Sequence, residues 1–176
     1  DYAKIEGHAN GSSTQSMIVG DFQYRVKPPI DAAHDWALIR LARPVCKGHV
    51  LPVAQLSTPA IIADAAAGRV FQLSYHRDWT QWRIAFSEPC SVARSFNAIP
   101  WSSIAPDFLN ADQMLLHQCD TGGASSGSPL IVERDGAFAV IAINVGTYVQ
   151  AKILTERGQV TLREKAETVA NTAVNA

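Results

Sequence analysis

The chain has 176 residues, of which 47% are hydrophobic and 18% charged, and its formal net charge is −1 at pH 7. This length suits one ordinary domain or two small barrels, and the scattered lysines and arginines argue against nucleic acid as a partner. The longest apolar segment, from Pro59, is interrupted by Asp64 and is shorter than the roughly 20 residues of a membrane-spanning helix. No contact with a membrane is therefore predicted.

Alternating apolar residues predict short β-strands over most of the chain. A polar gap around Asp78 separates two of these strands and predicts a hairpin between them. Asp135-Gly136 lies between two later apolar runs, which is a strong signal for a second hairpin. In chain order the predicted strands cover residues 36–41, 71–75, 82–86, 114–116, 130–132, 138–143 and 148–149.

Only the tail is predicted to be helical. Residues 161–164 read Thr-Leu-Arg-Glu and fit a capping box, in which two side chains satisfy otherwise unpaired amides. The alanine-rich segment 56–68 separates two strand-rich parts, so the predicted class is all-β, as two small barrels or sandwiches, with a C-terminal helix. Apolar residues recur at helical spacing in this tail at Leu162, Ala166, Val169 and Ala173.

Three cysteines, Cys46, Cys90 and Cys119, follow no Cys-x-x-Cys or Cys/His ligand spacing, so no metal site is predicted. The odd number leaves two interpretations. Either all three are buried thiols, or Cys90 and Cys119 form a disulfide bond and Cys46 pairs with a partner outside the chain.

The segment Thr121 to Leu130 reads TGGASSGSPL and offers two candidate nucleophiles. Residues 123–127 match the G-x-S-x-G elbow, which would select Ser125. That elbow needs a helix directly after the serine and a histidine later in the chain. Here a β-branched run follows, and all five histidines precede Ser125. The elbow interpretation therefore fails.

The second interpretation takes Ser126-Gly127-Ser128-Pro129 as the unit. Residues 124–129 resemble the G-x-S-G-x-P signature of the trypsin-like, chymotrypsin-fold serine proteases, in which Ser126 would be the nucleophile. The lead-in at 117–121, His-Gln-Cys-Asp-Thr, is most similar to the bacterial branch that includes the glutamyl endopeptidases. Residues 35–41, Asp-Trp-Ala-Leu-Ile-Arg-Leu, resemble the family's Asp-x-Ala-Leu-x-x-Leu strand, whose Asp, here Asp35, orients the catalytic His.

The resemblance implies a chymotrypsin-like double β-barrel: residues 1–56 as the remainder of an incomplete N-terminal barrel, and 57–176 as the C-terminal barrel with its helix. It also implies a disulfide bond between Cys90 and Cys119, a secreted or periplasmic location, and no cofactor. The partner would be a peptide or protein substrate, hydrolysed through a Ser/His/Asp triad and an acyl-enzyme.

The roles follow from the chemistry of acyl transfer. A serine hydroxyl is a weak nucleophile, so an imidazole takes its proton and a carboxylate, here Asp35, holds that imidazole. The resemblance makes the backbone amides of Ser126 and Ala124 the oxyanion donors, although the family usually has Gly at the position of Ala124. Ser125 replaces the Asp that pairs with the new N-terminus in trypsin, so trypsin-type zymogen activation is not predicted.

The resemblance also assigns a primary specificity pocket. Glutamyl endopeptidases have a His in the segment that corresponds to residues 143–145, and this chain has none there, so glutamate specificity is not predicted. The pocket is predicted to be lined by Asp120, Thr121, Gly122, Gly123, Asn144, Val145 and Gly146.

The general base is the part that the sequence does not supply. The family's Ala-Ala-His-Cys motif is absent, and His8, the only histidine far enough before Asp35, lies in a polar, Gly-containing setting. We expect that this chain lacks the first part of the N-terminal barrel, including the histidine and a partner for Cys46. By itself it is predicted to be inactive.

Two other interpretations remain open. The same fold without a catalytic histidine would be a pseudoprotease that binds a partner. Alternatively, the Gly/Ser loop is incidental to a β-sandwich binding module, in which case Asp35 and Ser126 would lie at opposite ends of the domain.

Overall fold

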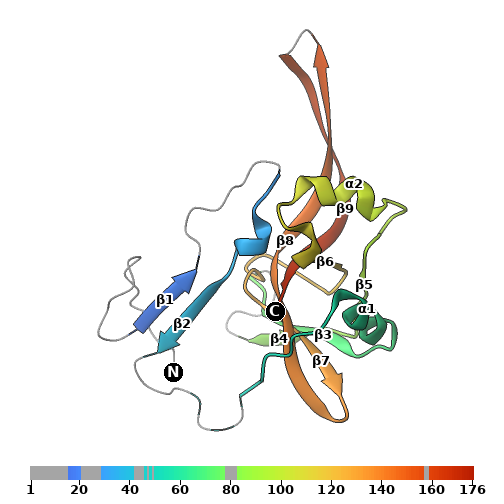
Figure 1. The fold of residues 1–176 in the computed structure, drawn as a ribbon. Helices are drawn as coiled ribbons and strands as arrows, with labels where there is room; N and C mark the ends of the chain where they lie inside the picture. Colours follow the sequence, from blue (N-terminus) through green and yellow to red (C-terminus); the bar gives the residue numbers. More distant parts are fainter. Residues whose placement is uncertain are drawn as a thin grey trace.

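The computed structural model describes residues 16–20, 29–41, 46, 48, 50–77, 83–156 and 159–176. A two-stranded antiparallel sheet, β1 (Ser16–Gly20) and β2 (Ala37–Leu41), stands beside a seven-stranded antiparallel sheet (Figure 1). The described protein is therefore mostly β, as predicted. The order β4-β3-β7-β8-β9-β6-β5 joins β3 (Val70–Tyr75), β4 (Ile84–Phe86), β5 (Val92–Ala93), β6 (Met114–His117), β7 (Pro129–Arg134), β8 (Ala137–Glu156) and β9 (Gln159–Asn175).

The larger sheet curls because its two edge strands are neighbours in the chain. β4 and β5 lie at opposite ends of the strand order, yet only residues 87–91 separate them. At one end of this segment the Ser87 amide donates to the Gln72 carbonyl on β3. At its other end the Ser91 carbonyl accepts from the Gln118 amide, just after β6. One short segment therefore contacts both edges of the curled sheet.

Both predicted hairpins are confirmed. β3 pairs with β4, with Leu73 opposite Phe86, and β7 pairs with β8. The connection between β7 and β8 is Asp135-Gly136, with φ angles of 53° and 76°. Positive φ at both central residues is the requirement of a type I′ turn, which matches the twist of the strands that it joins.

The predicted C-terminal helix is wrong, because the tail forms β9 between β6 and β8. Ala173 pairs with Leu115 on one side and Asn144 on the other. The capping box is a local signal, whereas the strand satisfies the backbone groups of two neighbouring strands. β-Branched residues, which favour strands, are frequent in this segment at Val160, Thr161, Thr168, Val169, Thr172 and Val174.

The alanine-rich spacer contains a helix that the sequence analysis did not predict, α1 (Thr58–Ala66). Ser57 is its N-cap residue, a proline occupies its first turn, and Gly68 follows its end with φ of 70°. These are ordinary start and stop signals. The remaining helical segments are α2 (Trp101–Ile104), η1 (Ala32–His34), η2 (Ala105–Asp107) and η3 (Ala111–Gln113).

Hydrophobic residues form two buried clusters. β6 contributes Leu115 to the first, with Ile61 of α1, and Met114 and Leu116 to the second. Because alternate residues of a strand point to opposite faces, both faces of this part of the sheet are covered. η1 belongs to the second cluster through its buried alanines, Ala32 and Ala33.

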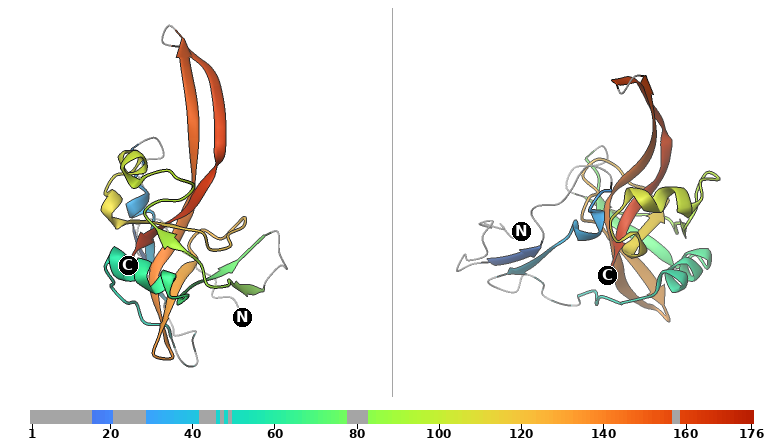
Figure 2. Two further views of the ribbon diagram at one scale, coloured as in Figure 1. Left: turned by 90° about the vertical axis from the view of Figure 1, so that its right-hand side faces the viewer. Right: turned by 45° about the horizontal axis from the view of Figure 1, so that its top comes forward.

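The N-terminal part is hydrogen bonded to the C-terminal part of the chain at more than one place. The Ala54 amide donates to the Val140 carbonyl over 2.8 Å, and Ile30 forms a bridge with Phe108. Beyond the sheet, β8 and β9 continue together as a two-stranded arm (Figure 2). No helix among the described residues is long and apolar enough to cross a membrane. The predicted division at residues 56 and 57 stays a prediction.

Candidate active site

The loop between β6 and β7 contains two successive tight turns. The Ser125 amide donates to the Gly122 carbonyl over 3.2 Å, and the Ser128 amide donates to the Ser125 carbonyl over 3.1 Å. The third residue of each turn, Ala124 and then Gly127, has a positive φ, of 77° and 82°. A positive φ at this position fits type II turns. The small residues of TGGASSGSPL therefore fold as a double turn.

The two adjacent serines of the double turn differ in their exposure to solvent. Ser125 is buried, with 5% exposure, and its hydroxyl lies 3.4 Å from Nδ2 of Asn144. Ser126 is exposed at the first central position of the second turn. Of this pair, only Ser126 is exposed to solvent, and its assignment as a nucleophile stays a prediction.

Some amides of this loop donate to an acceptor and others do not: those of residues 120–124 and of Ser126 have none among the described residues. Ser125, Gly127 and Ser128 each donate to a backbone carbonyl. By contrast, Ala124 and Ser126 have no acceptor for their amides among the described residues. Unbonded amides beside a nucleophile are what an oxyanion hole requires. These two are the amides that the sequence analysis assigned to that role.

Asp35 directly follows η1, whose buried face lies in the second hydrophobic cluster. Val145 of β8 packs against that cluster, and the neighbouring Asn144 contacts the double turn. η1 and Val145 thus belong to one hydrophobic cluster, and the double turn contacts the residue next to Val145. Burial raises the pKa of the Asp35 carboxyl, and no described side chain hydrogen bonds to it.

Three histidines lie in the described part of the chain, and each has a hydrogen-bond partner other than Ser126. Nδ1 of His34 lies 2.7 Å from Asp31, and Nε2 of His76 lies 2.7 Å from the Ser74 hydroxyl. His117 is bonded through both ring nitrogens. His8 and His49 lie outside the described residues. None of the described imidazoles therefore acts as a visible partner of Ser126.

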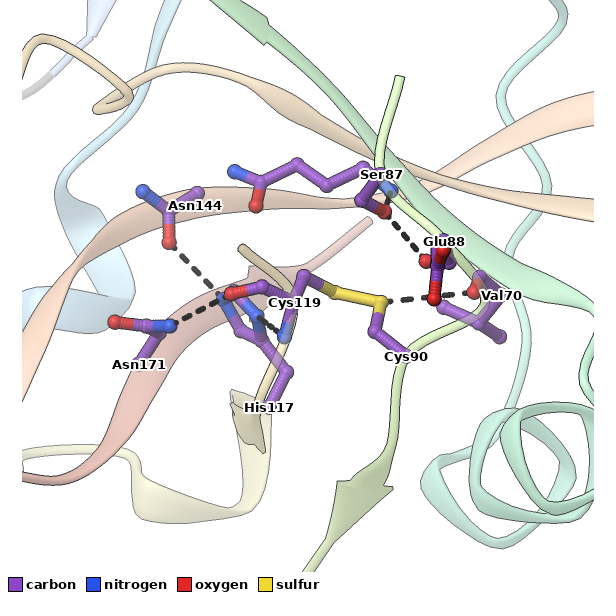
Figure 3. Close-up of a disulfide and its surroundings, with 9 residues drawn as sticks. Val70, Ser87, Glu88, Cys90, His117, Cys119, Asn144 and Asn171 are labelled. Atoms are coloured by element: carbon purple, nitrogen blue, oxygen red, sulfur yellow. Dashed lines mark hydrogen bonds between the residues drawn. A yellow bond between two sulfur atoms is a disulfide. The ribbon is translucent and has the colours of Figure 1, made fainter. Parts of the chain in front are cut away.

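The predicted disulfide between Cys90 and Cys119 is present and lies beside His117 (Figure 3). The Cys119 amide donates to Nδ1 of His117 over 3.3 Å, and Nε2 of His117 lies 3.0 Å from Oδ1 of Asn144. Burial lowers the pKa of His117 to about 4, although its hydrogen bonds with Asn144 and the Thr172 backbone oppose that shift. His117 is therefore neutral near pH 7. Cys46 is an exposed free cysteine.

A pocket of about 340 Å³ opens beside the start of the loop. Asp120, Thr121 and Gly122, three of the predicted substrate-binding residues, form one side. The other side is formed by His76, Ala85, Phe86 and Ser87. These four were missed, because the sequence predicts the β3–β4 hairpin but holds no signal for where the curled sheet brings it.

The other predicted substrate-binding residues lie in different settings. Gly123 is exposed, and its carbonyl accepts from the Arg77 amide over 2.7 Å. Asn144 is buried beneath the double turn with 2% exposure, while Val145 and Gly146 are half-buried on β8.

No cluster of three or more histidine, cysteine, aspartate or glutamate residues with metal-binding geometry occurs in the described ranges. In comparisons with known proteins, no family model matches the chain, and no curated protein matches it. Functional interpretation therefore rests on the chain's own residues.

Proposed function

We propose that the protein is a serine endopeptidase of the chymotrypsin fold, with Ser126 as its nucleophile. One observation carries the proposal: Ser126 is exposed on a tight turn, and its own amide and that of Ala124 lack acceptors among the described residues. A hydroxyl next to two unbonded amides can attack a carbonyl carbon while those amides bind the carbonyl oxygen.

The reaction would follow acyl transfer. Ser126 Oγ attacks the peptide carbonyl while an imidazole base takes its proton, and the amides of Ala124 and Ser126 hold the oxyanion. The C–N bond then breaks as the imidazole gives the proton to the leaving amine. Water repeats these steps on the acyl-enzyme and releases the second product. Asp35 would hold the imidazole in the required tautomer.

The fold and the disulfide support the proposal. A curled antiparallel sheet over the C-terminal part of the chain is the architecture expected for that barrel. The carboxyl of the half-buried Asp35, which receives no hydrogen bond from a described side chain, is suited to accept one from an imidazole. The disulfide bond between Cys90 and Cys119 fits an oxidising compartment, so we place the protein outside the cell or in the periplasm.

The base is to be sought outside the described residues. None of the three described histidines is hydrogen bonded to Ser126, and His117 is bonded to other groups through both ring nitrogens. The pocket beside Asp120 to Gly122 would receive a substrate side chain, with Phe86 as its apolar surface.

Covalent labelling tests the proposal on the full-length gene product. A fluorophosphonate should label the wild-type protein at Ser126, and Ser126→Ala should abolish the label. Ser125→Ala and Ser128→Ala are matched controls, because they remove neighbouring hydroxyls that are buried. Both should be labelled at close to the wild-type rate. A label that persists in Ser126→Ala would refute the assignment.

A second function, a pseudoprotease that binds a partner, is favoured because the three described histidines are hydrogen bonded to groups other than Ser126. It predicts that the full-length product, although folded, takes up no fluorophosphonate. Intact mass before and after reduction tests for a third case, in which the protein is a protease cleaved into two peptides that a disulfide bond holds together. Release of a second peptide that carries histidine and was bridged to Cys46 would identify a nicked, complete protease.

A further inference from the structure

Asn144 is hydrogen bonded to the turn that carries Ser126 through both its backbone and its side chain. Its amide donates to the Ser128 carbonyl and its carbonyl accepts from the Gly127 amide, both over 2.8 Å. Its side-chain Nδ2 donates to the Ser125 carbonyl over 3.1 Å. The residues on both sides of Ser126 are therefore tied to one residue of β8.

The side chain of Asn144 can work in only one orientation. The Ser125 carbonyl accepts hydrogen bonds and cannot donate, so the NH₂ group of Asn144 must face it. Oδ1 then faces Nε2 of His117, which must carry the proton of that ring. The tautomer is set in turn by Cys119, whose amide donates to Nδ1 of His117.

These bonds form a continuous path from the disulfide to the double turn. It runs from the Cys119 amide through His117 and Asn144 to Ser125, and Figure 3 shows its first part. His117 and Asn144 are 0% and 2% exposed, so water does not compete for these bonds. Both polar atoms of the Asn144 side chain are occupied, which leaves none for a substrate.

We propose that Asn144, oriented by His117, is a positioning residue that holds the nucleophile turn in its reactive shape. This inference rests on the proposed function. Without the Nδ2 bond, the Ser125 carbonyl would keep only the bond from the Ser128 amide, and the peptide that links Ser125 to Ser126 would be held less firmly in its orientation. The amide of Ser126 belongs to that peptide, so rotation would remove an oxyanion donor.

The first test is Asn144→Asp, which keeps the side-chain shape and the acceptor for His117 but removes the donor to Ser125. The second-order rate constant for fluorophosphonate labelling of Ser126 should fall about 10- to 100-fold, the scale expected for small misplacements of reacting groups. In peptide hydrolysis, kcat should fall by a similar factor while KM changes less than about twofold. The rate constants are measured under conditions in which both proteins are fully folded, so a purely structural loss of stability would leave them unchanged.

The matched control is Asn175→Asp. Asn175 also lies on a central strand and also donates through Nδ2 to a backbone carbonyl, that of Leu56, over 3.0 Å. It makes no hydrogen bond to the double turn within the described residues, so this variant should lose stability but keep the wild-type labelling rate constant. Equal rate constants for Asn144→Asp and the wild type would overturn the inference while leaving the proposed function intact.

A second pair of variants decides the matter where Asn144→Asp does not fold. His117→Gln keeps an N–H donor near the position of Nε2, whereas His117→Asn does not reach it. His117→Gln should therefore retain most of the labelling rate, and His117→Asn should lose about 10-fold. Equal rates would overturn the inference. If the wild type takes up no label at Ser126, the proposed function fails first, and this inference fails with it.

Discussion

Two groups of buried polar side chains in this protein are satisfied in different ways. Around Asp64, which is 1% exposed, the carboxylate is paired with Arg69 and Arg134, whose side chains are each 44% exposed. Around Asn144, all the groups are neutral, and the path ends on Ser125 beneath the exposed Ser126. We refer to these as the Asp64 cluster and the Asn144 network.

The two groups have different roles: the Asp64 cluster stabilises the fold, and the Asn144 network holds the loop that carries Ser126. The Asp64 cluster joins α1, the residue before β3 and the end of β7, so it fastens one side of the curled sheet. Its charges lie near solvent, which limits the desolvation penalty. A neutral amide can be buried completely when each polar atom has a partner, and it can both donate and accept. Asn144 can therefore join a strand to a loop.

The largest expected effect is a dependence of stability on pH that comes from His117. Its pKa falls from the ordinary 6.5 to about 4 on folding, so the unfolded chain binds more protons between these values. This contribution is complete above pH 6.5 and is lost as the pH falls to about 4, a change of about 3 kcal/mol in the free energy of unfolding. Denaturant titrations across this range measure it.

His117→Gln is the control for that dependence and should flatten the slope between pH 6.5 and 4. Asp64 contributes little there, because its pKa is lowered from 3.8 on folding and its contribution to stability is lost mainly below that value. NMR of the ring nitrogens should show the Nε2–H tautomer. A ring that titrates near 6.5 would remove the distinction between the neutral network and the charged cluster.

The next largest effect concerns the charged cluster. Burial alone would raise the pKa of Asp64, but hydrogen bonds from Arg134 and Arg69 outweigh it and lower the pKa. Asp64→Asn should reduce the free energy of unfolding at pH 7 by about 2 kcal/mol, the scale of hydrogen bonds to a charged group. The loss should shrink as the pH falls below about 4, because the unfolded wild-type chain then binds a proton at Asp64 that the folded protein does not yet bind.

The labelling rate constant of Asp64→Asn separates the two groups functionally. It should equal that of the wild type, because the cluster makes no bond to the double turn among the described residues. A fall comparable to that of Asn144→Asp would mean that both groups position the nucleophile, and the comparison would break down.

The sequence predicts the parts of this structure that depend on local pattern. The alternation at residues 71–75 and the Asp135-Gly136 turn predicted hairpins that are present. The helix predicted for the tail is wrong because the capping box is a local signal, whereas pairing with β6 and β8 is set by tertiary contacts. α1 was missed although Ser57, Pro59 and Gly68 mark its ends.

The candidate site divides in the same way. A short motif selected Ser126, and the family resemblance implied the bridge between Cys90 and Cys119. The role of His117 beneath the loop could not be predicted, because the bond to Asn144 spans 27 residues and depends on how the sheet curls. Asn144 was predicted to line a pocket, and its burial with both polar atoms occupied leads to the positioning role proposed above.

The smallest expected effect tests the backbone of the double turn. Ala124 has φ of 77°, a region that L-residues other than glycine rarely adopt, and Gly127 has φ of 82°. A Cβ added at Gly127 would meet nothing within 4 Å, so Gly127→Ala isolates the conformational penalty without a clash. It should destabilise the protein by about 1 kcal/mol, and Ala124→Gly should change stability by less, since relief of strain is offset by the entropy of the unfolded glycine. Thermal unfolding measures both.

Because Asn144, not the residue at 124, holds the turn, Ala124→Gly should keep the wild-type labelling rate constant. A large fall would show that the strained alanine itself sets the orientation of the oxyanion donors.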